Sequence, residues 1–220
     1  MSGYKIIDKE SWSRTDHYNF YRKFDNSCFN VCISVKAQKL YDFSKERGES
    51  FFQLCLFSIL RAANSIPQLK QRTLGNEVIE YNDINVMTPI MTKDEGFRQV
   101  LCESTPLFTD FRSQINGKIE EVKNAKAGPM IIQNEDFFCA SCLPWLHFDS
   151  ITHAEFHFGA AVPTLTWGQL KDGVVQWRVN STMLSLTVFM RAVFLRVLKI
   201  TSTTLIYFIL NESNCYLKNL

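Results

Sequence analysis

The side chains of this chain that could take part in catalysis or metal binding are a few histidines and one closely spaced cysteine pair. A neutral imidazole is the commonest general base at physiological pH, but the spacing of the histidines indicates no catalytic triad. Cys139 and Cys142 have the C-x-x-C spacing of zinc and redox sites, yet the sequence has no second such pair. We therefore interpret the pair, which lies in a strand-like run, as buried reduced thiols. The histidines are His17, His147, His153 and His157.

Among the elements that must position these side chains, the clearest prediction is a helix from Ser50 to Ile66. Apolar side chains recur there at three- and four-residue spacing on nearly all sides, which indicates a buried helix. Pro67 follows its end, where a proline is well tolerated. Further helices are expected over 11–24, up to Glu46 before Gly48, and over 108–126.

Strands are predicted where apolar residues alternate or cluster between turn residues. Gly75-Asn76 indicates a hairpin within 71–81, and Lys171-Asp172-Gly173 indicates a turn between two paired strands. The elements predict one α/β (α+β sandwich) domain over 1–220: a large, mostly antiparallel or mixed sheet covered by helices, with an atypical tail over 177–220. The other strands are expected over 27–35, 84–91, 97–102, 137–151 apart from Pro144, 162–170 and 174–179.

The bulk composition is that of a globular protein. The chain has 220 residues, of which 46% are hydrophobic and 21% charged, and this excludes a disordered chain. The net charge of +2 gives no reason to expect nucleic acid or a membrane as a partner. Seven cysteines, an odd number, and an N-terminus without a secretory signal pattern favour a cytoplasmic location with reduced thiols.

Four segments, in order over about residues 1–175, resemble the chloramphenicol acetyltransferase family. Each segment alone is a weak signal, but four in register are specific. The first matches the pattern W-x-R-x-x-H-[FY]-x-[FY]-[FY]. The segments are Trp12 to Tyr21, Phe52 to Arg72, Ser141-Cys142-Leu143-Pro144-Trp145 with the residues up to Asp149, and Thr164 to Gly168.

This resemblance implies a homotrimer with active sites in the clefts between subunits, where acetyl-CoA and chloramphenicol enter from opposite ends of a tunnel. In the family, a histidine takes the proton from the 3-hydroxyl of the antibiotic, and this oxygen attacks the thioester carbonyl. A serine hydroxyl donates to the oxyanion. A hydroxyl needs such a base, since it is a weak nucleophile, and the transition state needs a fixed donor where its charge develops.

The resemblance also assigns roles to residues of this chain. Ser141 corresponds to the oxyanion serine, and Phe20, Tyr21 and, less directly, Phe97 correspond to rings of the antibiotic pocket. Thr166 corresponds to a threonine that holds a water in the site. Without the resemblance, Ser141 would be an ordinary half-buried polar residue of a strand, and Phe20 and Tyr21 would be core residues of a helix.

Arg14 corresponds to a structural arginine that pairs, in the family, with the aspartate of the catalytic motif H-x-x-x-D-G. That motif is absent from this sequence. The segment from Met183 to Leu220 contains no histidine, and Val179 to Met190 offers neither a base nor an aspartate for Arg14. Trp145 and Trp167 are interpreted as structural residues.

A single-base shift explains the missing motif. Suppose that the codon of Thr182 ends in C. Synonymous codons can then be chosen for Met183 to Phe194 so that, when they are read one base earlier, they translate as H-A-L-V-D-G-F-H-A-G-R-F. The methionine codon is unique, so Met183 and Met190 each restrict the shifted residue to His, Tyr, Asn or Asp, at the spacing of the two histidines in the motif. We therefore hypothesise a shift that starts between about Gln176 and Asn180, in the gene or its reported sequence.

Three functions stay open on this basis. The first is acetyl-CoA-dependent O-acetyl transfer to chloramphenicol, impaired in the chain as written. The second is a catalytically dead binding module, and the third is an unstable product that does not assemble. The tail could also be a membrane-facing helix, but Arg191, Arg196 and Lys199 interrupt it and leave no run of about 20 apolar residues. Acyl transfer of the dihydrolipoyl type, a related use of the fold, is less favoured because no lipoyl segment precedes the domain.

Overall fold

A computed structural model of the chain describes residues 3–126, 128, 134–152 and 162–184. The described strands form a six-stranded sheet of order β2-β9-β8-β7-β5-β6 and a three-stranded sheet of order β1-β4-β3. The strands are β1 (Tyr4–Ile6), β2 (Cys28–Lys36), β3 (Gln71–Leu74), β4 (Glu77–Tyr81), β5 (Asn85–Met91), β6 (Phe97–Cys102), β7 (Phe137–Cys142), β8 (Thr164–Lys171) and β9 (Val174–Thr182). The helices are α1 (Thr15–Tyr21), α2 (Gln38–Arg47), α3 (Phe51–Asn64), the 3-10 turn η1 (Pro67–Lys70) and α4 (Phe108–Lys123).

The six-stranded sheet is mixed, as the sequence predicts. The pairs β2–β9, β9–β8 and β5–β6 are antiparallel, whereas β8–β7 and β7–β5 are parallel. The second sheet forms because the predicted hairpin of β3 and β4 pairs with β1 instead of joining the large sheet. No local sequence signal predicts this long-range pairing.

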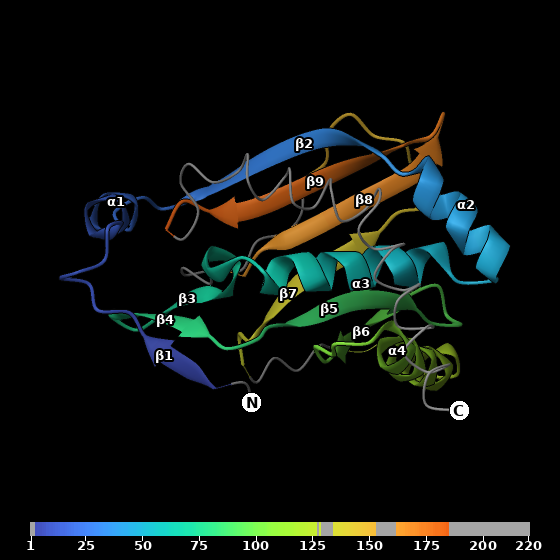
Figure 1. Ribbon diagram of the computed structural model, residues 1–220, viewed down its shortest axis with the longest axis horizontal. Coiled ribbons are helices and arrows are strands. Elements are labelled where there is room, and N and C mark those ends of the chain that lie inside the picture. The colour runs from blue at the N-terminus through green and yellow to red at the C-terminus, as the bar shows by residue number, and fades with distance from the viewer. Residues whose placement is uncertain (1–2, 127, 129–133, 153–161, 185–220) are drawn as a thin grey trace, which may run out of the picture.

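Helix α3 lies against one face of the large sheet and forms the centre of the core (Figure 1). The Oγ of Ser50 accepts a hydrogen bond from the backbone N of Gln53 at 3.4 Å, which satisfies one free N–H at the start of the helix. Phe57 packs on Phe108 and Phe111 of α4, with ring centroids 5.5 and 5.4 Å apart. The prediction of a buried helix after Ser50 is confirmed.

Two predicted boundaries are wrong. The strand expected over 137–151 ends at Cys142, because the chain turns after Leu143 and the N of Leu146 donates to the O of Leu143 at 3.0 Å. The helix expected over 11–24 covers only Thr15–Tyr21. The expected turns are present: Gly75, Asp172 and Gly173 have φ values of 59°, 52° and 77°. Among the helices that the structure describes, none has the length and apolar character needed to cross a membrane.

Candidate active site

A polar row crosses the large sheet on the face opposite α3. The Cα atoms of Ser141 and Thr166 are register partners on β7 and β8, and Thr166 is in turn the partner of Arg178 on β9. The residues that alternate with them, such as Ala140 and Leu165, point into the core around α3. Ser141 and Thr166 therefore lie side by side on the outer face of the sheet.

The sheet opens next to Ser141. Strands β5 and β7 pair only from Asn85 to Met87, although β5 continues to Met91. Pro89 has no N–H to donate to a neighbouring strand, so its presence accounts for the end of this ladder. The parting of β5 and β7 leaves room for ligands between the two strands.

A cavity of about 490 Å³ occupies this opening, and Ser141 is part of its wall. Its size is that of a small-molecule site. Among the residues that the structure describes, none forms a hydrogen bond with the Ser141 hydroxyl, which leaves that group available to a ligand. The other wall residues include Pro89, Met91, Phe97, Gln99, Cys139, Trp145 and Thr164.

A second cavity, of about 520 Å³, adjoins the first. Pro89, Met91, Cys142 and Trp145 belong to the walls of both, so the two spaces meet at the end of β7. The far wall of the second cavity is largely aromatic and comes from α2, α3 and β8. It consists of Tyr41, Phe51, Phe52 and Trp167.

The loop after β7 is held against β8 by a close backbone contact. The N of Leu143 donates to the O of Trp167 at 2.9 Å, and the N of Gln169 donates to the O of Leu146 at 2.6 Å. Trp167 itself is fully buried and stacks on Phe52 with ring centroids 5.8 Å apart, as a structural residue would, and it also borders the second cavity. The loop in this way fixes one side of both cavities.

Phe20 and Tyr21 lie elsewhere, on α1. Their rings pack on each other with centroids 5.1 Å apart, and Phe20 is 55% exposed. Helix α1 precedes the Cys28 end of β2, and three strand spacings, about 15 Å, separate β2 from β7 (Figure 1). Neither ring belongs to the wall of the Ser141 cavity. Phe97 does belong to this wall. Thr166 is buried beside Ser141 and does not belong to the wall, whereas Thr164 on the same strand does.

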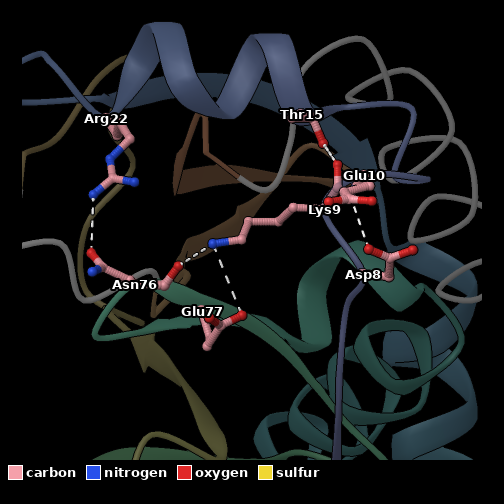
Figure 2. A network of polar contacts seen from close by, with 7 residues as sticks. All are labelled: Asp8, Lys9, Glu10, Thr15, Arg22, Asn76 and Glu77. Atoms are coloured by element: carbon pink, nitrogen blue, oxygen red, sulfur yellow. Dashed lines mark hydrogen bonds and ion pairs between the residues drawn. The ribbon is translucent and has the colours of Figure 1, made fainter.

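A network of polar contacts anchors α1 to the hairpin of β3 and β4 (Figure 2). The Nζ of Lys9 donates to the backbone O of Asn76 at 2.5 Å and lies 3.9 Å from a carboxylate oxygen of Glu77. At the other end of the helix, Arg22 donates to the side-chain oxygen of Asn76 at 3.4 Å. Thr15, the first residue of α1, donates to the backbone O of Lys9. The position of α1 is therefore set by the second sheet as well as by the first.

Arg14 immediately precedes α1, and its guanidinium is incompletely paired. Its Nε and one terminal nitrogen are buried and form no hydrogen bond to any residue that the structure describes. The group lies 5.9 Å from the centre of the Trp12 ring. Burial lowers the pKa of Arg14, as expected for a cation that is partly removed from water.

No described histidine approaches Ser141. His17 is on α1 and packs on Tyr21, and His147 is exposed in the loop after β7; neither is a wall residue of a described cavity. His153 and His157 lie outside the described residues. Within the described part of the chain, no group of three or more metal-binding side chains is present. Cys139 and Cys142 are free thiols that are half-buried in the wall of the Ser141 cavity, not fully buried as predicted. Burial raises their pKa values to about 11 and about 12, which disfavours the reactive thiolate.

Two residues of the site have no counterpart in the sequence-based prediction. Trp145, expected to be structural, is 60% exposed and borders both cavities instead of packing in the core. Gln99 reaches the Ser141 cavity from β6. Pro144 before Trp145 could have indicated that the tryptophan leaves the strand, but no signal in the sequence brings Gln99 next to Ser141.

The mixed sheet, its buried helix α3 and the two cavities at the end of β7 occur in a chain whose sequence matches an acetyltransferase family. The family model for chloramphenicol acetyltransferase matches residues 2–169, and the chain belongs to this family. It is 26% identical over 175 residues to chloramphenicol acetyltransferase 2 of Escherichia coli, covering 77% of this chain and 82% of that protein.

Solved structures agree with this assignment. The fold is similar to that of a chloramphenicol acetyltransferase, with a TM-score of 0.82 and 25% identity over 90% of this chain and all of the other. It is also similar to the dihydrolipoamide acetyltransferase of Azotobacter vinelandii, with a TM-score of 0.62 and 13% identity over 84% of this chain and 85% of the other. The second likeness concerns the fold alone.

Proposed function

We propose that this chain has the substrate sites of a chloramphenicol O-acetyltransferase and lacks the group that makes the reaction fast. One observation carries the proposal: in a member of this family, Ser141 lies in the wall of a cavity of about 490 Å³ with an available hydroxyl. The reaction is acetyl transfer from acetyl-CoA to the 3-hydroxyl of the antibiotic. The products are an acetate ester and free coenzyme A.

The two cavities support a binding mode for both substrates. The acceptor alcohol occupies the cavity of Ser141, whose walls include the ring of Phe97. The pantetheine arm of acetyl-CoA occupies the aromatic cavity beyond Trp145. The thioester then lies where the cavities meet, so that the two substrates enter from opposite sides.

In this binding mode, the hydroxyl oxygen of the acceptor attacks the thioester carbonyl and forms a tetrahedral intermediate. The Ser141 hydroxyl donates to the oxyanion that develops at the former carbonyl oxygen. The C–S bond breaks, and the proton removed from the acceptor hydroxyl leaves with the coenzyme A thiol. A base must carry this proton, and the segment from Met183 to Leu220 has no histidine to do so.

The site is incomplete within one copy of the chain. Phe20 and Tyr21, which correspond to pocket rings in the family, lie on α1 and outside the Ser141 cavity. A homotrimer with its sites between subunits resolves this separation, because α1 of one subunit then faces Ser141 of the next. The exposure of Phe20 agrees with such a contact.

The reading-frame hypothesis also belongs to this proposal. Arg14 has buried nitrogens without hydrogen bonds among the described residues, as expected if its aspartate partner is missing. The notional aspartate falls at Thr187, outside the described residues. Sequencing the gene across codons 176–194 tests the hypothesis, and codons that cannot encode the motif in the shifted frame contradict it.

Activity is tested with purified protein, acetyl-CoA and chloramphenicol, by measuring the release of free coenzyme A thiol. We expect turnover to be about 10²- to 10⁴-fold below that of the protein expressed from a frame-corrected gene, the cost of losing a general base. Equal rates for the two proteins overturn the proposal. Chloramphenicol binding without turnover identifies a binding module, whereas an aggregated or monomeric product identifies a failure of assembly.

A further inference from the structure

Strand β8 brings a second hydroxyl group to the Ser141 cavity. Thr164 and Thr166 lie on the outer face of this strand, because Leu165 between them is buried in the core around α3. Thr166 is fully buried, whereas Thr164 is half-buried and belongs to the wall of the cavity. The cavity therefore has a threonine on β8 in addition to the serine on β7.

The register of the sheet places Thr164 close to Ser141. The Cα partner of Thr164 on β7 is Cys139, which is also a wall residue, and Ser141 follows two residues later on the same face. A strand spacing of about 4.8 Å and a rise of about 6.6 Å over two residues separate the Cα atoms of Ser141 and Thr164 by about 8 Å. One small molecule can therefore contact both hydroxyls.

The hydroxyl of Thr164 is available to a ligand. Among the residues that the structure describes, none forms a hydrogen bond with it. The hydroxyl of Thr88 on β5 is different, because it has no described partner and is closed off from solvent. The Thr164 oxygen does not belong to that group of enclosed atoms, so it keeps accessible surface, and Thr164 borders the cavity. A hydroxyl of this kind can either donate or accept a hydrogen bond.

We infer that Thr164 is a substrate-binding residue whose hydroxyl forms a hydrogen bond with a polar group of the acceptor other than the hydroxyl that is acetylated. The inference rests on the proposed function, in which the acceptor occupies this cavity and Ser141 contacts the reacting centre. Chloramphenicol meets the requirement because it carries a second hydroxyl and an amide group. Acceptor alcohols without a second polar group cannot make this contact and bind less tightly.

The test compares the full-length parent chain with Thr164→Val and Thr164→Ser by calorimetric titration with chloramphenicol. Valine has nearly the shape of threonine and no hydroxyl, so we expect the Kd of Thr164→Val to rise about 5- to 10-fold, as for the loss of one hydrogen bond. Serine keeps the hydroxyl, so the Kd of Thr164→Ser should stay within about threefold of the parent value. Equal losses of affinity in both variants would assign the contact to the methyl group and overturn the inference.

Thr88→Val is the matched control. Thr88 is fully buried on β5, and it belongs to the wall of neither described cavity. The substitution makes the same chemical change on the same sheet, away from the ligand. It should leave the Kd within about twofold of the parent value, and a rise equal to that of Thr164→Val would overturn the inference.

Thermal unfolding without ligand separates a binding role from a structural one. Thr164→Val should keep or raise the Tm of the parent chain, because it removes no hydrogen bond to a described residue and valine is favoured in strands. A clear fall in the Tm of Thr164→Val that Thr164→Ser does not share shows that the hydroxyl serves the fold and overturns the inference. An unchanged Kd for Thr164→Val, when the parent chain binds the antibiotic, overturns the inference alone. If the parent chain does not bind chloramphenicol, the proposed function fails and the inference with it.

Discussion

Gly168 and Leu146 approach each other so closely that only glycine fits at position 168. A Cβ atom added at Gly168 would lie 2.5 Å from the carbonyl oxygen of Leu146 and 3.0 Å from the ring of Phe148. The neighbouring residue Gln169 donates its N–H to the same carbonyl at 2.6 Å. This contact holds the loop that carries Trp145 against β8, and the loop borders both cavities.

Gly168→Ala should therefore destabilise the fold and enlarge or distort the cavities. The backbone of the loop must move, since the clashing atom belongs to the main chain, and we expect a loss of about 1–3 kcal/mol in the free energy of unfolding. Urea unfolding measures this loss.

Gly117→Ala in α4 is the matched control for Gly168→Ala. A Cβ added at Gly117 meets no atom within 4 Å, so alanine should raise the stability by about 0.5–1 kcal/mol through helix propensity alone. If both substitutions change the stability equally, the contact with Leu146 does not constrain the loop.

Arg14→Met tests whether Arg14 has lost a partner. In the chain as written, the substitution removes a partly buried cation whose pKa is lowered by burial and two of whose nitrogens form no hydrogen bond to a described residue. We expect the free energy of unfolding to stay the same or to rise by about 1 kcal/mol.

The same substitution in protein expressed from a frame-corrected gene should have the opposite sign. There we expect the aspartate of the motif to pair with Arg14, so removal of Arg14 should cost about 3 kcal/mol. Comparing the four proteins by urea unfolding isolates the pair. A similar loss in both backgrounds would mean that Arg14 has its partner already in the printed chain.

Arg72 should be among the most sensitive positions for stability. Arg72 is 2% exposed, and its guanidinium donates to four backbone carbonyl oxygens at distances of 2.6 to 2.9 Å. These carbonyls belong to η1, to β3, to Glu135 before β7, and to the first residue of β7, the strand that carries Ser141. Burial lowers its pKa to about 10, so it stays charged at neutral pH.

Arg72→Met leaves those four carbonyl oxygens without a donor and should cost about 3–5 kcal/mol, measured by urea unfolding. Arg98→Met is the control, because Arg98 is exposed and donates to the single carbonyl of Lys126. A small effect of Arg72→Met, similar to that of Arg98→Met, would show that the carbonyls are satisfied in another way.

Buried thiols should make the protein lose stability at alkaline pH. Burial raises the pKa of Cys102 and Cys139 to about 11 and that of Cys142 to about 12, against about 9 for an exposed thiol. As the pH rises above 9, the unfolded chain loses these protons first. The stabilisation is therefore complete below pH 9 and is lost as the pH rises to about 11–12.

At pH 10, each of these thiols should therefore contribute about 1 kcal/mol less to the free energy of unfolding than it does below pH 9. Urea unfolding in the presence of a reductant, at pH 8 and pH 10, measures the difference. Cys102→Ala removes one thiol with a raised pKa. Its loss of unfolding free energy between pH 8 and pH 10 should be about 1 kcal/mol smaller than that of the parent chain. An identical loss in the two proteins contradicts the assignment to Cys102.

Much of the fold could be predicted because its signals are local. The apolar positions from Phe51 to Ile66, with Ser50 before them, predict a buried helix that the structure contains. The turn at Asp172-Gly173 could be read in the same way. The error over 137–151 has a physical cause as well, because strand-like residues continue past Cys142 while the pairing with β8 stops there.

The candidate site could be predicted only in part. The match of Ser141 with its family motif singled out that residue, and the structure places it in a cavity with Phe97. Phe20 and Tyr21 lie on α1, which the second sheet holds away from that cavity. Trp145 and Gln99 reach the cavity from a loop and from a strand, and their own segments carry no sign of it.

The sequence alone determined the family, the order of most helices and strands, and the absence of any histidine from the segment after Thr182. These properties follow from local residue patterns and do not depend on which residues contact each other in the folded chain. Tertiary structure decided that β5 parts from β7 beside Ser141, that Gly168 must admit the backbone of Leu146, and that Gln99 borders the resulting cavity. The physical reason is that strand register and close packing join residues far apart in the chain, and no local pattern records which ones they are.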